Sequence, residues 1–430
     1  MKSILVFFIS VIYLFASNTP FDIYKKETNP QEHTLLIIGG IHGDEPGGFF
    51  APAFLESYYK IKSGNLWIVP NANSDSIIAN NRGIYGDMNR KFNTIDKNDK
   101  DILTVNRLKE LVLEKRVDLV LNLHDGFGFY RDVYEDAVFN PNSWGQATII
   151  DQEKIEDKFG NLSQIANQVN ENLNKDRLFE HFHVFNVKNT QTKEKDEQMR
   201  QSLTFFAVSN NKPAFAIETS KNITDLTYKV IYQLKSIEEF MNIMDIKFER
   251  QFDINNYEDV KSKIYDFGKV TINNNITLDL SDIRNSVKFL PLKKDGNKFE
   301  FSHTLAKFKS IENRYEIYIG NIKVCDLMPQ IFDVVESQNK IKMIVDGKEI
   351  ETPFASQVDI KNDFKILKSD LRANIIGFSK NGVDSEDDIL IKKDDIQDVY
   401  SLDTNQSKYR AEFYKDGKFV GMVVLNFLKK

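Results

Sequence analysis

The sequence of 430 residues contains a single cysteine, Cys325, so no disulfide can form within the chain. The fold must therefore be stabilised by burial of its hydrophobic side chains, which make up 41% of the residues. Cys325 lies in the segment NIKVCDL, which is typical of a β-strand. We expect its side chain to be buried as a small apolar group and not to act as a nucleophile.

The chain also lacks an excess of basic residues. Lysine and arginine together number 57, against 63 aspartates and glutamates, which gives a formal charge of −6 and a pI of about 5.7. Proteins bind nucleic acids through basic side chains that displace the counterions of the phosphates. The charge balance therefore disfavours nucleic acid as a general partner, although it leaves room for local basic clusters.

The apolar run at the N-terminus is short for a membrane-spanning helix. It follows Lys2, extends to Phe15 and ends in small residues, which is the order found in a secretory signal peptide. We predict a signal peptide over residues 1–17; a retained anchor and a buried core helix are the alternatives. The protein is then expected in the bacterial periplasm or an equivalent space, with no stable membrane span after cleavage.

Residues 18–247 alternate between predicted strands and predicted helices. Buried-type strands are predicted at TLLIIGG, LWIVPNAN, VDLVLNLHDG and PAFAIETS. Helical spacing of apolar residues occurs in FFAPAFLESYYK, DKDILTVNRLKELVLEKR, KIEDKFGNLSQIANQVNENL and ITDLTYKVIYQLKSIEEFMNIM. This succession is typical of an α/β domain with a mixed or largely parallel sheet flanked by helices.

The helical periodicity fades after about residue 247. Short segments rich in β-forming residues follow, separated by Asp-Gly and Asn-Gly turn signals. This region is too long for one small sandwich. We therefore predict two all-β, sandwich-like domains, over residues 248–338 and 339–430.

Ionisable residues stand at the ends of three predicted buried strands. His42 and Glu45 follow TLLIIGG, His124 ends LVLNL, and Glu218 ends PAFAI. Ligands of α/β proteins bind beyond the carboxyl ends of the strands, so we expect these four side chains to meet.

The set of His42, Glu45 and His124 predicts a site for one zinc ion. A catalytic zinc takes three protein ligands, nitrogen or carboxylate oxygen, and keeps a position open for water. The glycines around His42 allow a turn tight enough for the side chains of His42 and Glu45 to reach one ion. A turn histidine satisfied by the backbone is the alternative for His42, and a capped core histidine is the alternative for His124.

Glu218 is the predicted general base. Zinc lowers the pKa of its bound water to about 7, and a nearby carboxylate can take the proton and pass it to the leaving amine. The alternative is a carboxylate at the sheet rim in a salt bridge. Asp125, next to His124, is equally well read as a partner that orients a ligand or as a turn residue.

The loop NNRGIYGDMNRKFN between the predicted ligands contains Arg82, Asn89 and Arg90. Arginine can bind a carboxylate with two parallel hydrogen bonds and can stabilise a developing oxyanion. Two solvated loop arginines are the alternative, which the position of the loop between metal ligands makes less attractive.

Taken together, HGDE at 42–45, Arg82, NR at 89–90, LNLHD at 121–125 and AIET at 216–219 resemble the zinc carboxypeptidase superfamily. With its signal peptide and two β domains, the chain is most similar to the periplasmic peptidoglycan DL-carboxypeptidases that determine helical cell shape. The resemblance covers the first domain. It implies a zinc enzyme that trims the tripeptide stems of muropeptides to dipeptides and releases meso-diaminopimelate from γ-D-glutamate.

The resemblance also implies roles for individual residues. Asn89 and Arg90 would hold the terminal carboxylate of the substrate, Arg82 would polarise the scissile carbonyl, and Glu218 would be the base. Trp144 and Thr204 fall where this group shapes the substrate pocket. One departure is the covering tyrosine of the digestive branch, which has no counterpart in the candidate lid at 183–206.

Two other functions remain open at this level. An amidohydrolase of the aspartoacylase and desuccinylase type shares the HxxE, histidine and Asn-Arg pattern, but its substrates are cytoplasmic. A non-catalytic protein that binds the cell wall through its β domains is the second alternative. His181 and His183 would share one face of a strand, which we interpret as a polar face and not as a second metal site.

Overall fold

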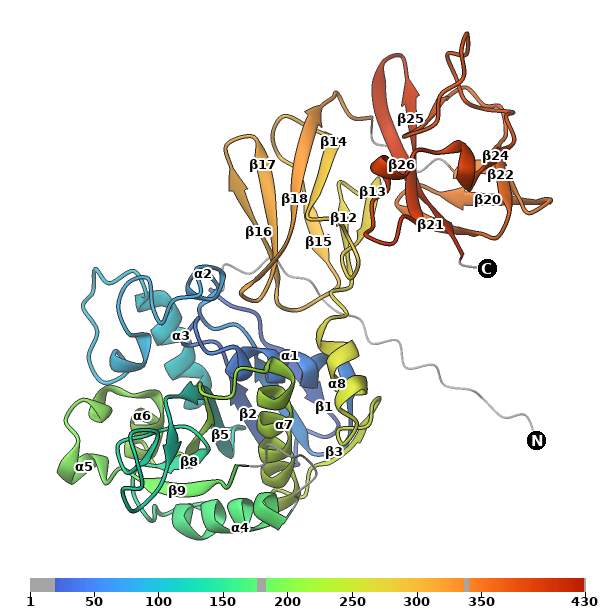
Figure 1. Ribbon diagram of the computed structural model, residues 1–430. Coiled ribbons are helices and arrows are strands. Elements are labelled where there is room, and N and C mark those ends of the chain that lie inside the picture. Colours follow the sequence, from blue (N-terminus) through green and yellow to red (C-terminus); the bar gives the residue numbers. More distant parts are fainter. Residues whose placement is uncertain (1–19, 176–182, 336–339, 429–430) are drawn as a thin grey trace, which may run out of the picture.

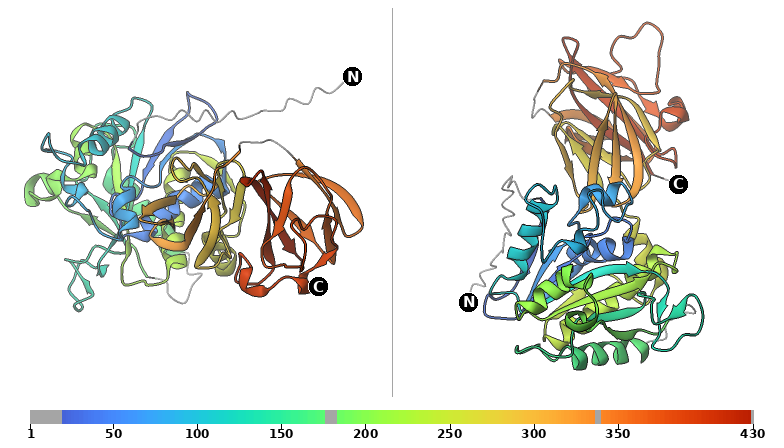
Figure 2. Two further views of the ribbon diagram at one scale, coloured as in Figure 1. Left: turned by 90° about the horizontal axis from the view of Figure 1, so that it is seen from above. Right: turned by 90° about the vertical axis from the view of Figure 1, so that its left-hand side faces the viewer.

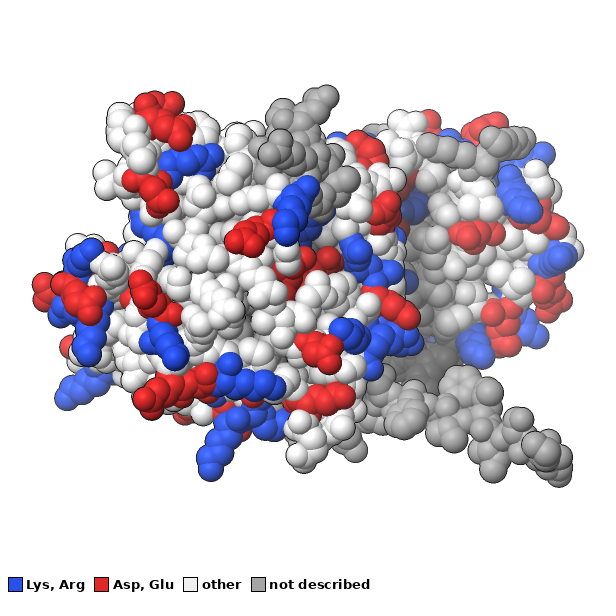
Figure 3. Space-filling model, turned by 90° about the horizontal axis from the view of Figure 1, so that it is seen from below, with Lys and Arg blue, Asp and Glu red and all other residues white. Residues whose placement is uncertain are grey.

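The computed structural model describes residues 20–175, 183–335 and 340–428, so the predicted signal peptide at 1–17 lies outside the described residues. Figure 1 shows three regions, a larger α/β domain and two smaller β domains, and both β domains lie at one end of the molecule (Figures 1 and 2). Within these residues, no helix has the length and apolarity that crossing a bilayer requires. The face drawn in Figure 3 mixes acidic and basic side chains around a broad uncharged area.

The α/β domain is built on a mixed sheet of seven strands. Their order is β1-β4-β2-β5-β10-β8-β9. The four central strands, from β4 to β10, run parallel, whereas β1 pairs antiparallel with β4 and β8 pairs antiparallel with β10. The strands are β1 (Tyr24–Glu27), β2 (Thr34–Ile38), β4 (Asn65–Val69), β5 (Leu119–Gly126), β8 (Ala147–Ile150), β9 (Asn186–Asn189) and β10 (Ala214–Ser220). Of the central strands, β2, β4 and β5 are buried along their whole length, as their continuous apolar runs predict.

Helices cover both faces of this sheet. On one face α7 packs against α1, α4 and α8, and on the other α3 packs against α6. The helices are α1 (Pro46–Tyr58), α2 (Ser74–Ile78), α3 (Ile102–Val112), α4 (Leu162–Lys175), α5 (Thr192–Lys195), α6 (Leu203–Ser209), α7 (Leu226–Ile243) and α8 (Tyr257–Ile264). The helix expected from Ile155 begins only at Leu162, because residues 155–160 close a tight turn through a hydrogen bond from the Ile155 amide to the Gly160 carbonyl.

The short elements complete the α/β domain. A two-stranded sheet pairs β3 with β11, and a second pairs β6 with β7. β11 begins at residue 247 and α8 follows it, and both pack on this domain, while the predicted domain boundaries stay predictions. The elements are β3 (Tyr59–Ser63), β6 (Phe129–Tyr130), β7 (Phe139–Asn140) and β11 (Lys247–Arg250), with the 3₁₀ turns η1 (Met88–Arg90) and η2 (Met199–Gln201).

Each of the two β domains contains two sheets. The first domain has the sheets β13-β12-β15 and β14-β18-β17-β16; the second has β20-β19-β22-β24 and β21-β26-β25-β23. Two pairs are parallel, β14 with β18 and β21 with β26, which the turn signals did not reveal. The elements are β12 (Lys269–Ile272), β13 (Ile276–Asp279), β14 (Ser286–Leu292), β15 (Phe299–Phe301), β16 (Ala306–Ile311), β17 (Arg314–Ile319), β18 (Ile322–Ile331), β19 (Lys340–Val345), β20 (Lys348–Pro353), β21 (Ser356–Ile360), β22 (Asp363–Ile366), β23 (Arg372–Ile375), β24 (Ile391–Lys392), β25 (Lys408–Lys415) and β26 (Lys418–Phe427), with the turns η3 (Lys393–Asp395) and η4 (Asp398–Tyr400).

Cys325 lies in β18 with its side chain buried, as predicted. Burial raises the pKa of its thiol to about 12, so it stays protonated at neutral pH and is a poor nucleophile.

The tip of the β17–β18 hairpin contacts the α/β domain. Gly320 has a φ of +57°, and a Cβ there would lie 2.8 Å from the ring of Phe49 in α1. The next residue, Asn321, donates from its side chain to the side chain of Asn80, 3.0 Å away. The first β domain therefore packs against segments that follow the first predicted metal ligands in the chain.

We expect Gly320→Ala to destabilise the protein more than Gly347→Ala does. Both glycines have a left-handed backbone, so both variants lose about 1 kcal/mol from that conformation. Only Gly320 also meets a side chain, since the space around Gly347 is open to 4 Å. Chemical denaturation of the two variants measures the difference. Equal losses would mean that the hairpin contact adds nothing to stability.

A second prediction concerns His303, between β15 and β16. Its Nδ1 accepts a hydrogen bond from the amide of Leu305 at 3.1 Å, which requires an unprotonated nitrogen. Burial lowers the pKa of His303 from 6.5 to about 4. The unfolded chain then binds one more proton than the folded protein between these pH values, so stability falls as the pH drops through this window.

The matched variant is His303→Asn, whose side-chain oxygen can accept from the amide two residues on without titrating. We expect unfolding free energies measured at about pH 7 and about pH 5 to differ less for the variant than for the wild type. The same pH dependence in both would contradict the role of His303.

Candidate active site

The turn that carries His42 and Glu45 depends on two glycines. Gly40 has a φ of +72°, a conformation that favours glycine. Gly43 packs so closely on α2 that a Cβ would come within 1.9 Å of the carbonyl oxygen of Ser76. The chain can therefore turn sharply after β2 and place Glu45 at the N-terminus of α1.

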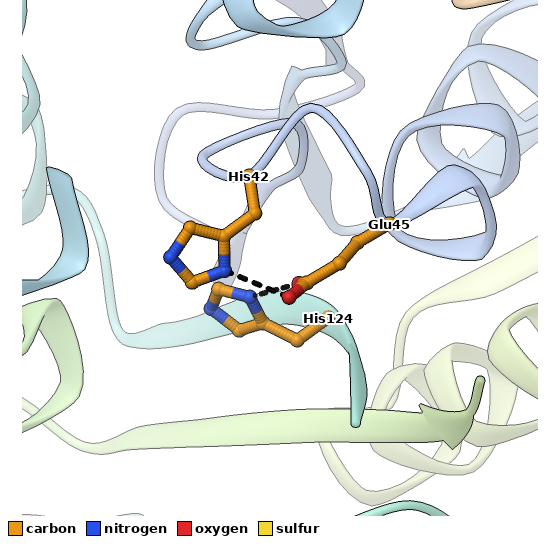
Figure 4. A group of neighbouring side chains, drawn as sticks. All are labelled: His42, Glu45 and His124. Atoms are coloured by element: carbon orange, nitrogen blue, oxygen red, sulfur yellow. Dashed lines mark hydrogen bonds and ion pairs between the residues drawn. The ribbon is translucent and has the colours of Figure 1, made fainter. Parts of the chain in front are cut away.

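His42, Glu45 and His124 meet at the carboxyl ends of β2 and β5. Figure 4 shows the carboxylate of Glu45 between the two imidazole rings. Its Oε1 lies 2.9 Å from Nδ1 of His42, and its Oε2 lies 2.7 Å from Nδ1 of His124. All three residues are at most 3% exposed, so water does not screen their interaction.

The charges in this cluster are strongly coupled. Burial opposes the ionised form of Glu45, but His42 and His124 outweigh it and hold the pKa of Glu45 well below its usual range. Burial lowers the pKa of His124. It also opposes charge on His42, yet the carboxylates of Glu45 and Asp87 outweigh it and raise the pKa of His42. The cluster thus favours the ionised form of Glu45.

The three residues also suit a metal cation. One possible ligand atom from each residue lies within 4.8 Å of those of the other two. Among the described residues, these three side chains form a group that could hold a metal ion. Two imidazole nitrogens and a carboxylate this close repel one another unless a proton or a cation lies between them. Two nitrogens and one oxygen are a donor set that zinc accepts.

Asp87 was not among the predicted site residues, yet it orients a predicted ligand. Its Oδ1 lies 2.7 Å from Nε2 of His42, so in the neutral ring Nε2–H donates to Asp87 and the lone pair of Nδ1 faces Glu45. Its Oδ2 accepts from Nε of Arg82 at 2.9 Å. The signal in the sequence was an acidic residue between the two arginines of one loop.

The predicted loop residues Arg82, Asn89 and Arg90 lie next to this cluster. Nη1 of Arg82 donates to Oε1 of Glu45 at 2.9 Å, and its side chain is 44% exposed. The side-chain oxygen of Asn89, in η1, accepts from the amide of Leu203 at 3.0 Å and so fixes the start of α6. Arg90 donates to the carbonyl of Asn89 at 3.1 Å and forms no ion pair with any described residue, which leaves its charge free for an anion.

Asp125 does not contact His124 through its side chain. Its Oδ2 accepts from the amide of Gly47 and from Nζ of Lys229, each at 3.0 Å, and its Oδ1 accepts from the hydroxyl of Thr219. Asp125 therefore joins β5, β10, α1 and α7 beneath the site. Its backbone amide also donates to Oε2 of Glu45 at 3.2 Å, which agrees with the interpretation of Asp125 as a partner that orients a predicted ligand.

Glu218 lies on β10 directly opposite His124 on β5. Burial, together with the negative charges of Glu45 and Asp125, raises the pKa of Glu218 well above its usual value. Lys221 comes directly after β10. Its Nζ lies 3.7 Å from Oε1 of Glu45 and 2.6 Å from Oδ2 of Asp44. The rim of the sheet thus holds a carboxyl group with a strong affinity for a proton beside the candidate metal ligands.

Trp144 and Thr204 belong to two neighbouring groups of side chains. The centre of the Trp144 ring lies 4.3 Å from Nζ of Lys188. Burial lowers the pKa of Lys188 to about 8, and the negative charge of Glu218 partly offsets this effect. Thr204, in the first turn of α6, is buried and its hydroxyl lies 3.2 Å from that of Ser202. Their predicted contact with substrate stays a prediction, and Lys188 is an addition that the sequence did not suggest.

The interpretation of His181 and His183 as one polar strand face is not tested by the described residues. His181 lies outside the described residues, and His183 precedes β9. The ring of His183 packs against that of Phe129, with the ring centres 4.2 Å apart.

The family comparisons agree with this geometry. The model of the catalytic domain of carboxypeptidases controlling helical cell shape matches residues 2–264, and the model of the C-terminal domain of metallo-carboxypeptidases matches residues 334–428. The chain belongs to the family of carboxypeptidases that control helical cell shape, and it is a metallocarboxypeptidase. This membership favours the peptidase over the desuccinylase-type enzyme and the non-catalytic wall protein.

The solved structures of the cell shape determinant protein Csd4 from Helicobacter pylori are similar over nearly the whole chain. The apo and tripeptide-bound forms share 34% identity with a TM-score of 0.88, over 95% of this chain and 100% of theirs. The mDAP-bound form, of a protein described as a D,L-carboxypeptidase, shares 35% identity with a TM-score of 0.88, over 94% of this chain and 100% of its own. The comparison with curated proteins gave no match. The predicted fold class, a mixed α/β domain followed by all-β domains, is confirmed.

The pair of Asp125 and Lys229 leads to a prediction about stability. Lys229→Met leaves the buried Asp125 without its cation, which we expect to cost about 3–5 kcal/mol of unfolding free energy. Adding Asp125→Asn removes the unpaired charge and keeps an acceptor for the Gly47 amide, so the double variant should be more stable than Lys229→Met alone. Urea denaturation tests the order; a double variant that is less stable than the single one contradicts it.

Proposed function

We propose that the chain is a zinc-dependent DL-carboxypeptidase of the cell wall. Its substrate would be the tripeptide stem of a muropeptide, which it trims to a dipeptide by releasing meso-diaminopimelate from γ-D-glutamate. The observation that carries the proposal is the convergence of His42, Glu45 and His124 beside Glu218 in a member of this family. The tripeptide-bound and mDAP-bound structures of the similar protein support the choice of substrate.

The proposal assigns one zinc ion to His42, Glu45 and His124. When bound, such an ion supplies a water of lowered pKa and polarises a carbonyl. Asp87 keeps Nδ1 of His42 directed at the ion by accepting from its Nε2. The burial of the three ligands keeps competing water away from them.

Glu218 is the group that we assign to proton transfer. Its raised pKa means that it holds a proton firmly once it has taken one, as a base that later protonates the leaving amine must do. The negative charge of Glu45 is one of the causes that raise the pKa of Glu218. A cation bound next to Glu45 would offset that charge and so lower the pKa of Glu218. The carboxyl group can therefore exist in both forms during one reaction.

The arginine loop is assigned to the substrate. Asn89 and Arg90 would bind the terminal carboxylate, for which the unpaired charge of Arg90 is available. Arg82 would face the scissile carbonyl, since its guanidinium already extends from an exposed loop to Glu45. Trp144 and Thr204 would line the pocket, with Lys188 beside the indole ring.

The proposal includes export. An enzyme that acts on peptidoglycan works outside the cytoplasm, so we assign the chain to the periplasm and residues 1–17 to a cleaved signal peptide. We also assign the α/β domain to residues 18–247, the first β domain to 248–338 and the second to 339–430.

The proposal predicts a split between activity and metal content. We expect Glu218→Gln to lower kcat on a muropeptide tripeptide by about 10²–10⁴-fold, because it removes the base, while still binding about one zinc per chain. His124→Ala should lose both the zinc and the activity. Chromatography of the released meso-diaminopimelate and elemental analysis measure the two properties. Near wild-type turnover in Glu218→Gln would exclude it as the base.

A further inference from the structure

A cavity lies between the two β domains, apart from the metal site. Its volume is 680 Å³, which is within the range of sites for small ligands. One wall comes from β14 and β18 of the first β domain, and the other from β23, β25 and η4 of the second. The two β domains are adjacent in both Figures 1 and 2.

A strained bulge shapes the first wall. The pairing of β14 with β18 skips Lys288 and Phe289, and Phe289 has a φ of +55°, which is unfavourable for an aromatic residue. Nη2 of Arg410 donates to both carbonyls of the bulge, at 3.0 Å each, and so holds it in place. As a result, Phe289 lines the cavity and is 63% exposed. Contact of an apolar ring with water is unfavourable, as is the strained backbone that places it there. Tyr400, 45% exposed, lines the cavity from the opposite wall.

The cavity carries positive charge without matching carboxylates. Four cationic residues line it, and one carboxylate, Glu412, pairs with Arg410 at 2.9 Å. Over the described part of the chain, Lys288 and Arg372 form no ion pair. Arg284 is held by the second β domain, because its guanidinium donates to the hydroxyl of Ser401 and to the carbonyls of residues 398 and 403. Arg410 is 4% exposed, and its Nη1 has no hydrogen-bond partner among the described atoms. A buried guanidinium nitrogen without a partner is rare and is satisfied by an anion or by water.

The two walls are fixed relative to each other. The amide of Met422 in β26 donates to the carbonyl of Asn275 at 2.9 Å, next to β13. Nζ of Lys408 contacts Asp279 at 2.7 Å and Asp282 at 2.8 Å, across the same interface. Binding in a cavity that is already formed avoids the cost of ordering its walls.

We propose that this cavity is a second binding site, for a carboxylate-bearing strand of peptidoglycan. The exposed rings of Phe289 and Tyr400 would pack on the apolar faces of its sugars. Lys288 and Arg372 would bind the carboxylates of its peptide stems. The identity of the polymer rests on the proposed function, whereas the need for an anionic and partly apolar ligand follows from the cavity itself.

The test is binding of the full chain to purified sacculi. In the background of Glu218→Gln, which prevents trimming, the variants are Phe289→Asn and Arg372→Gln. Asparagine tolerates a positive φ, so Phe289→Asn removes the ring without straining the bulge. We expect the double variant to bind sacculi about tenfold more weakly in co-sedimentation, because each loss of a charged hydrogen bond or ring contact weakens binding substantially. The matched control is Lys348→Gln, an exposed lysine of β20 that lies outside the cavity.

A second measurement separates this site from the catalytic one. With Glu218 intact, Phe289→Asn with Arg372→Gln should cleave a soluble tripeptide muropeptide with the kcat/KM of the wild type. Unchanged binding to sacculi would overturn the second site, and so would an equal loss on the soluble substrate. Failure of the wild type to cleave that substrate would instead overturn the proposed function, and the binding measurement would still be decisive for the cavity.

Discussion

The buried carboxylate of Glu45 is the interaction on which the catalytic site depends. A negative charge at 3% exposure is costly unless cations and donors surround it. Here they come from four segments: His42 in the same turn, His124 on β5, Arg82 in the loop, and Lys221 after β10. The position of Glu45 at the start of α1 adds the favourable end of a helix dipole. The fold therefore brings strand ends together around one charge.

Three carboxyl groups at this rim have different properties because their partners differ. Glu45 lies between two imidazoles and stays ionised. Asp125 has the ammonium group of Lys229 and two further donors, the amide of Gly47 and the hydroxyl of Thr219, around it, and it holds the elements together. Glu218 faces the other two charges with less compensation, so its pKa rises. Neighbouring carboxyl groups whose pKa values are pushed apart are the usual basis for assigning an acid and a base.

The sequence predicted the parts that depend on local pattern. Continuous apolar runs predicted the central strands, and the polar residue at the end of each run predicted His42, Glu45, His124 and Glu218. The roles of Asp87, Lys188 and Lys229 depend on which distant segments meet, and no spacing rule reveals that. The predicted start of α4 was wrong. Apolar residues at helical spacing begin before the helix, in a turn that is closed by backbone hydrogen bonds.

The same limit explains why the second cavity could not be predicted. Its two exposed aromatic residues, Phe289 and Tyr400, lie in different domains, and each alone looks like an ordinary surface residue. The two domains are connected here by Arg410, whose side chain extends from β25 to the bulge in β14. The sequence therefore offered no aromatic platform for sugars, although the structure has two rings and two cations without an ion pair among the described residues, Lys288 and Arg372, lining one cavity.

Rigid connections between the domains give the two sites a fixed spacing. The hairpin tip at Gly320 packs on α1, and β26 is hydrogen-bonded beside β13, so neither β domain is joined to the rest only by a linker. A strand held in the cavity raises the effective concentration of its own stems at the metal site, provided that its length spans the gap. A free tripeptide reaches the metal site without this advantage. Two sites on one rigid body thus favour stems on an intact polymer over released fragments, and a flexible linker would weaken that preference.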